Sequence, residues 1–167
     1  DVAPSRGLGD VYKRQMYNGA LAGVSLAGDR FFYVNPLESN GDHHRQAWYG
    51  CACCPSQISR FLPSIGNYIY GTSDKALWVN LFIGNTTEVT IDGKKVVMKQ
   101  ETDYPWDGLV KLTVTSEQPL GKELRIRIPG WCKSYTLSVN GNKVDSTTDK
   151  GYTVIKEWKT GDLIVLN

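Results

Sequence analysis

The sequence predicts an α+β chain, in which a helical first part is followed by an antiparallel β-sandwich. Apolar residues between Ile58 and Ile69 recur at helical spacing, whereas from Leu77 onward they follow the period of two that is typical of strands. Short apolar runs then alternate with turn signals to the end of the chain, among them Asp92-Gly93 and Asn140-Gly141. Many short strands with regular turns favour a sandwich.

The composition is that of a globular protein and excludes several partners. The 167 residues are 41% hydrophobic and carry a net charge of +2, which favours neither a nucleic acid nor an anionic membrane as partner. No apolar stretch approaches the roughly 20 residues of a membrane span. The sequence does not indicate a compartment, so a bacterial cytoplasm and a periplasm both stay open.

The first residues are interpreted as non-native. Residues 5–15 read SRGLGDVYKRQ, which is one translated frame of the common transposase sequencing adapter. We therefore expect residues 1–15 to be adapter-derived and disordered, and exclude them from fold reasoning. The native coding sequence would enter near Met16, so we expect a fragment. The final GDLIVLN reads as a strand stopped in progress.

The helical part is expected to span residues 16–70. Met16–Ala22 is compatible with the last turns of a helix, 30–34 with a short strand or an extended segment, and 38–50 with a polar loop. A helix should follow, with Pro55 as its first residue. Pro63 should kink or split that helix, because it has no N–H and its ring clashes with the preceding turn.

The β domain is expected to span residues 71–167. Gly161-Asp162 marks another turn between strands. The apolar runs place strands at 77–83, 87–91, 94–99, 109–115, 122–128, 135–139, 152–157 and 162–166.

The stretch YGCACCPSQ, residues 49–57, holds three of the four cysteines: Cys51, Cys53 and Cys54. If Pro55 is the first helical residue, Cys54 is the N-cap, where the helix end lowers a thiol pKa. Adjacent thiolates can also bind one Zn²⁺. From the residues alone, small packing side chains, a metal site and a metal-free reactive cysteine all stay open. Candidates for two further zinc ligands are Cys51, His43, His44, Glu38 and Asp42.

Other polar and aromatic residues allow two interpretations each. The pair His43-His44 is either solvated or a ligand or substrate contact, and Glu38 is either a turn carboxylate or a catalyst. Tyr104, Trp106 and Trp131 either pack or stack on sugars.

Four segments together resemble glycoside hydrolase family 127, the β-L-arabinofuranosidases, in one collinear order from about Met16 to Asn167. They read YNGALAGVSLAGDRFFYVNPLES, HHRQAWYGCACCPSQISRFLPSIGNYIYG, QETDYPWDG and LRIRIPGW. The resemblance implies the C-terminal end of an (α/α)₆ barrel over 16–70, followed by a β-sandwich that is truncated at its C-terminus.

The resemblance also implies site residues. Cys53 would be the nucleophile of a retaining exo-glycosidase, and Cys53 and Cys54 would hold Zn²⁺ together with a glutamate and a cysteine upstream of Met16. A further upstream glutamate would be the general acid/base, and the substrates would be arabinofuranose-containing plant glycans or glycoproteins. Cys51 has no such role and is expected to pack. Without the upstream residues, the fragment is expected to be inactive.

Two other functions remain as alternatives. One is a non-catalytic carbohydrate-binding β-sandwich module that stacks sugars on Tyr104, Trp106 and Trp131. The other is a redox or metal sensor that uses Cys51, Cys53 and Cys54.

Overall fold

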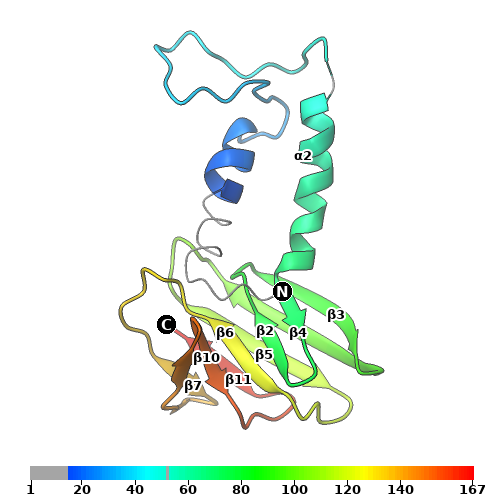
Figure 1. The fold of residues 1–167 in the computed structure, drawn as a ribbon, viewed down its shortest axis with the longest axis vertical. Helices are drawn as coiled ribbons and strands as arrows, with labels where there is room; N and C mark the ends of the chain where they lie inside the picture. The colour runs from blue at the N-terminus through cyan, green and yellow to red at the C-terminus, as the bar shows by residue number, and fades with distance from the viewer. Residues whose placement is uncertain (1–14, 52) are drawn as a thin grey trace. The chain divides into compact units, whose positions relative to one another are not determined.

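A computed structural model describes residues 15–51 and 53–167, apart from the side chain of Cys54. The chain forms two compact units, residues 1–66 and 67–167 (Figure 1). Apart from Gln15, the segment interpreted as adapter-derived lies outside the described residues.

The first unit begins with two short helical turns. A π-helical turn, η1 (Gln15–Ala20), runs into a 3₁₀ turn, η2 (Leu21–Gly23), which confirms the helical ending expected at Met16–Ala22. A Cβ at Gly23 would lie 3.3 Å from the side-chain amide of Asn35, so a larger residue here would require that amide to shift by a few tenths of an ångström.

The structure forms no regular strand at 30–34, where a short strand or an extended segment is expected. Phe31 exchanges backbone hydrogen bonds with Gln46, both of 2.9 Å, and forms only isolated bridges with Gln46 and Val24. The hydroxyl oxygen of Ser25 accepts hydrogen bonds from the backbone N–H groups of Asp29 and Arg30. These bonds close a tight turn before Phe31, so pairing is limited to one residue. The loop expected at 38–50 is confirmed, apart from the bridge at Gln46.

Helix α2 (Cys53–Ser64) supplies the main helix of this unit. It begins two residues before Pro55, so the expectation that Cys54 caps the helix is wrong; Cys54 lies in its first turn. The α-helix passes Pro63 and ends one residue later, where the 3₁₀ turn η3 (Ile65–Tyr68) follows. Pro63 cannot donate to the carbonyl of Ser59, which explains why regular α-helical bonding stops here.

The second unit is a sandwich of two sheets (Figure 1). The five-stranded sheet has the order β1 (Tyr70–Thr72), β2 (Ala76–Val79), β6 (Glu123–Arg127), β10 (Tyr152–Ile155) and β9 (Thr147–Asp149). The six-stranded sheet has the order β3 (Asn85–Ile91), β4 (Lys94–Thr102), β5 (Val110–Ser116), β11 (Leu163–Leu166), β7 (Leu137–Val139) and β8 (Asn142–Lys143). The described pairings are antiparallel, which confirms the sandwich, except that β2 and β6 run parallel, with Leu77 opposite Leu124.

Apolar side chains from both sheets fill the space between them. Leu77 and Leu124 of one sheet and Met98, Leu112 and Ile164 of the other belong to one core cluster, and each is at most 2% exposed. Alternate positions along each strand face this core, as the period of two requires.

The turns expected from the sequence join neighbouring strands. Asp92 and Gly93 link β3 to β4 with φ of 51° and 73°, and Asn140 and Gly141 link β7 to β8 with φ of 50° and 81°. Two successive positive φ values are typical of the type I′ hairpin turn. None of the described helices is long and apolar enough to cross a membrane.

Candidate functional site

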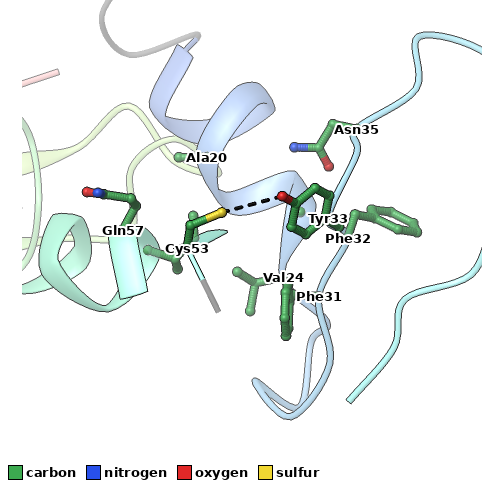
Figure 2. Close-up of a pocket in the computed structure, with 10 residues that line it drawn as sticks. Ala20, Val24, Phe31, Phe32, Tyr33, Asn35, Cys53 and Gln57 are labelled. Atoms are coloured by element: carbon green, nitrogen blue, oxygen red, sulfur yellow. Dashed lines mark hydrogen bonds between the residues drawn. The ribbon is translucent and has the colours of Figure 1, made fainter. Parts of the chain in front are cut away.

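The sulfur of Cys53 lies at the start of helix α2 and borders a hollow of about 310 Å³ in the first unit (Figure 2). The volume lies at the lower end of the range usual for small-molecule sites. Phe31 and Phe32 contribute aromatic walls, whereas Tyr33, Asn35 and Gln57 bring polar groups to the same space. This is an apolar hollow with a few hydrogen-bonding groups around one thiol.

Tyr33 is the polar neighbour of the Cys53 sulfur. Its hydroxyl oxygen lies 3.5 Å from Cys53 Sγ (Figure 2). Hydrogen bonding to Cys53, and next to Cys51, raises the pKa of Tyr33 well above its usual value. The phenol therefore keeps its proton at neutral pH and can donate a hydrogen bond to an ionised sulfur. A thiolate that accepts such a bond is stabilised.

Tyr33 was missed by sequence reasoning, because it lies in the segment expected to be a short strand or extended and has no motif of its own. Its ring lies 5.6 Å from that of Tyr49, which in turn meets Phe31 edge-on at 5.1 Å. This aromatic group holds the phenol in place. Tyr33 lies in YNGALAGVSLAGDRFFYVNPLES, one of the four segments that resemble the family, but the resemblance implies no role for it.

Cys51 also lies beside the nucleophile candidate. Its Sγ donates a hydrogen bond to Cys53 Sγ at 3.5 Å, and both side chains are exposed. The expectation that Cys51 packs is therefore wrong. The side chain of Cys54 lies outside the described part of the chain, so its expected role as a ligand stays a prediction.

The thiols of this stretch suit zinc in their chemistry. Two thiolates bound tetrahedrally to one Zn²⁺, each at about 2.3 Å, lie about 3.8 Å apart, close to the 3.5 Å between Cys51 and Cys53. Soft sulfur donors at a helix start, where anions are stabilised, fit such an ion. Across residues 15–51 and 53–167, however, no three His, Cys, Asp or Glu side chains gather. The described donors alone do not make a complete zinc site, and zinc binding stays a prediction.

His43 holds the loop in shape. Its Nε2 forms a 2.9 Å hydrogen bond with the carbonyl oxygen of Val34, and its ring stacks on Phe32 at 4.8 Å. Arg45 adds a guanidinium 4.4 Å from the same Phe32 ring and donates to the carbonyl of Ala22. Of the other candidates, His44, Glu38 and Asp42 are exposed, and the described structure gathers none of them with the cysteines as a metal-binding group.

The aromatic residues singled out in the sandwich divide into two kinds. Tyr104 packs, because its ring meets Phe82 of the core edge-on at 5.4 Å. Trp106 is 91% exposed and Trp131 is 63% exposed. Trp106 follows the end of β4 in one sheet, and Trp131 follows the end of β6 in the other.

The comparisons with known proteins divide the chain in the same order. Residues 1–67 match the profile of the β-L-arabinofuranosidase GH127 catalytic domain, and residues 76–167 match that of the GH127 middle domain. The first match begins at residue 1 and so includes the segment interpreted as adapter-derived, whose origin stays a prediction. A curated relative, the non-reducing end β-L-arabinofuranosidase of Bifidobacterium longum, is 36% identical over 93% of this chain and 26% of its own length.

Solved structures agree with this. A GH127 β-arabinofuranosidase is 40% identical, with a TM-score of 0.88 over 96% of this chain and 28% of its own. A GH127 β-L-arabinofuranosidase from Geobacillus stearothermophilus T6 is 43% identical, with a TM-score of 0.85 over 97% of this chain and 28% of its own. The chain thus spans about a quarter of the length of these relatives.

The matches are consistent with the expected fold class, the end of an (α/α)₆ barrel followed by a β-sandwich. Two profiles of one family follow each other in the order that the sequence motifs indicated, and together they take in nearly all of the chain. The chain belongs to glycoside hydrolase family 127.

Proposed function

We propose that this chain carries the nucleophile of a retaining exo-glycosidase that hydrolyses terminal L-arabinofuranosides, and that Cys53 is that nucleophile. The observation that carries the proposal is the Cys53 sulfur at the N-terminus of α2, bordering a hollow and 3.5 Å from the phenol of Tyr33. The relatives named as β-L-arabinofuranosidases support the substrate class. The natural substrates would be arabinofuranose-containing plant glycans or glycoproteins.

The reaction follows the two steps of retaining glycosidases, with sulfur in place of the usual carboxylate. The Cys53 thiolate attacks the anomeric carbon, the glycosidic C–O bond breaks, and a carboxylic acid protonates the departing oxygen. We expect that acid, a glutamate, on a segment outside residues 16–167. Water then attacks the anomeric carbon of the thioglycoside and gives its proton to the same carboxylate. The C–S bond breaks, and the thiolate returns.

Side chains around Cys53 have separate tasks in this proposal. The Tyr33 hydroxyl donates a hydrogen bond to the Cys53 thiolate, both before the thiolate attacks the sugar and after the sugar is released. The amides of Asn35 and Gln57, which border the same hollow, hydrogen-bond sugar hydroxyls. Phe31 and Phe32 line the same hollow, where their rings can pack against the sugar.

Zinc completes the proposal. Cys53 and Cys54 would be two of its ligands, and a glutamate and a cysteine outside residues 16–167 would be the others. When bound, the ion keeps the cysteine sulfur ionised at neutral pH.

A chimera tests the proposal. Residues 16–167 replace the aligned segment of the Bifidobacterium longum relative, and hydrolysis of 4-nitrophenyl β-L-arabinofuranoside is measured. We expect activity in the chimera, its loss on Cys53→Ala, and its retention on Cys132→Ser, since Cys132 lies in the sandwich. An active Cys53→Ala chimera would rule out Cys53 as the nucleophile.

The isolated chain gives a second test. With the acid/base and two zinc ligands absent, it should show no turnover of the same substrate and only weak zinc binding by calorimetry. Stoichiometric tight binding of zinc, or clear turnover, would contradict the expected location of the missing groups.

The exposure of Trp106 and Trp131 supports a second candidate, a carbohydrate-binding sandwich. Exposed indoles are suitable surfaces for stacking sugar rings. This candidate does not use Cys53, and its test is given in the Discussion.

A further inference from the structure

Cys51 and Cys53 form a pair of thiols that the proposed hydrolysis does not explain. Their sulfurs lie 3.5 Å apart, and both side chains are exposed. The glycosidase reaction needs only one of them as nucleophile. By contrast, Cys132 is half-buried and donates its S–H to the carbonyl of Ser134 at 3.1 Å.

We propose that this pair is a site of reversible oxidation by peroxides, with Cys53 as the sulfur that is oxidised first and Cys51 as the cysteine that resolves it into a Cys51–Cys53 disulfide. Cys53 is the first target, because its sulfur borders the hollow described above, where a peroxide can reach it. Cys51 follows, since it is already in contact with that sulfur.

The geometry allows the bond. A disulfide needs an S–S distance of about 2.05 Å and a Cα separation of roughly 4.4–6.8 Å. From 3.5 Å, the sulfurs must approach by about 1.5 Å, which rotation of the two exposed side chains can supply. One residue lies between the two cysteines, so chain connectivity limits their Cα separation to about 7 Å, near the upper end of this range. The adjacent pair Cys53-Cys54 could close only a strained disulfide.

The oxidation balances in two steps. The Cys53 thiolate attacks one oxygen of a peroxide, the O–O bond breaks, and a sulfenic acid and hydroxide form. The Cys51 thiolate then attacks the sulfenic sulfur, the S–O bond breaks, hydroxide leaves, and the disulfide forms. Two thiols lose two electrons and the peroxide gains them; the two thiol protons end in water. A dithiol reductant reverses the reaction by exchange.

One consequence rests on the proposed function. If Cys53 is the nucleophile, the disulfide stops hydrolysis and protects the sulfur from irreversible oxidation to sulfinic acid. The modification itself does not depend on glycosidase activity, so its test uses mass rather than turnover.

The experiment uses the 167-residue chain, treated with a chelator so that bound metal does not shield the sulfurs. It is exposed to hydrogen peroxide, blocked with one alkylating agent, reduced and labelled with a second. Trypsin places all three clustered cysteines on one peptide, residues 46–60, and fragment ions locate each label. We expect the second label on Cys51 and Cys53, and its loss when dithiothreitol precedes blocking.

Matched variants make the result decisive. Cys132→Ser and Cys54→Ser should keep the disulfide, whereas Cys51→Ser should lose it and collect sulfinic or sulfonic acid at Cys53. A disulfide from Cys53 to Cys54, one between chains, or equal over-oxidation with and without Cys51 would overturn the proposal. If the disulfide forms in this chain but the chimera does not hydrolyse arabinofuranosides, the proposed function is refuted and the inference about the disulfide stands.

Discussion

The hydroxyl of Tyr33 lies 3.5 Å from the sulfur of Cys53. The two residues come from different elements, since Tyr33 lies just after the bridge at Phe31 and Cys53 begins helix α2. The fold of the loop between them thus brings a protonated phenol to the proposed nucleophile.

Tyr33→Phe in the chimera should lower kcat/KM for the nitrophenyl arabinofuranoside by about 10- to 100-fold. The variant keeps the ring and removes one hydrogen bond to a charged group, which contributes about 1.5–3 kcal/mol. Tyr49→Phe, which alters a ring of the same aromatic group, is the matched control and should leave kcat/KM within about twofold. Equal losses in both variants would mean that the Tyr33 hydroxyl acts only through packing.

Lys122→Met should destabilise the sandwich by about 2–4 kcal/mol in urea unfolding. The Lys122 side chain is 3% exposed, and its Nζ donates to the carbonyls of Ser73 and Asp74 and pairs with Asp92 at 2.9 Å. Removing the ammonium leaves these acceptors without their partner. Lys95→Met breaks an ion pair with Glu88 in which both side chains are more than half exposed. It should change stability by less than about 1 kcal/mol, and a similar loss in both variants would refute the argument from burial.

The stability of the chain should fall at alkaline pH, in part through Tyr70. Burial raises the pKa of Tyr70, although hydrogen bonds with Asn85 and Gln100 act in the opposite direction. Above pH ~10 the unfolded chain ionises this phenol while the folded chain still holds its proton, so the free energy of unfolding decreases as pH rises.

Tyr70→Phe separates this effect from the rest. At pH 7 it should cost about 1 kcal/mol, since Asn85 still accepts a hydrogen bond from Thr87. Between pH 7 and pH 11 the variant should lose less stability than the parent in urea unfolding. Parallel losses in the two proteins would show that Tyr70 does not contribute to the alkaline decrease.

Trp106→Ala tests the carbohydrate-binding candidate. Because the indole is 91% exposed, the substitution should change the free energy of unfolding by less than about 0.5 kcal/mol. If the sandwich binds arabino-oligosaccharides, their affinity should fall at least tenfold in calorimetry, in line with the loss of a stacking contact. Trp48→Ala removes an exposed indole of the first unit and should leave binding unchanged. Absent binding by the unmodified chain would remove this candidate.

Much of the sandwich could be predicted because its signals are local. The turns at Asp92-Gly93 and Asn140-Gly141 need positive φ, and the alternation between them follows the pleat. The expected strand 77–83 was too long, since β2 ends at Val79. Beyond Val79, the carbonyls of Leu81 and Ile83 accept hydrogen bonds from the buried side-chain amide of Gln100. Gln100 is distant in the sequence, so the local alternation of apolar residues gives no sign of these bonds.

The candidate site was only partly predictable for the same reason. Cys53 could be singled out from the motif that contains it. The contacts of Tyr33 and Cys51 with its sulfur depend on how the loop folds, and neither residue carries a spacing signal. The pattern at 30–34 left a short strand and an extended segment both open, because an apolar run looks the same whether one residue or five are paired. In the structure, Phe31 pairs with Gln46 only through a single bridge.

The parallel pairing of β2 with β6 has a consequence for folding. Strands β3, β4 and β5 of the opposite sheet lie in the chain between these two neighbours. β2 and β6 can therefore pair only when the long segment between them, which contains much of the other sheet, has been brought into a closed loop. Closing this loop costs conformational entropy before the contacts between the two strands are gained. We expect the sandwich to fold slowly and in one cooperative step, with neither sheet able to persist as a half.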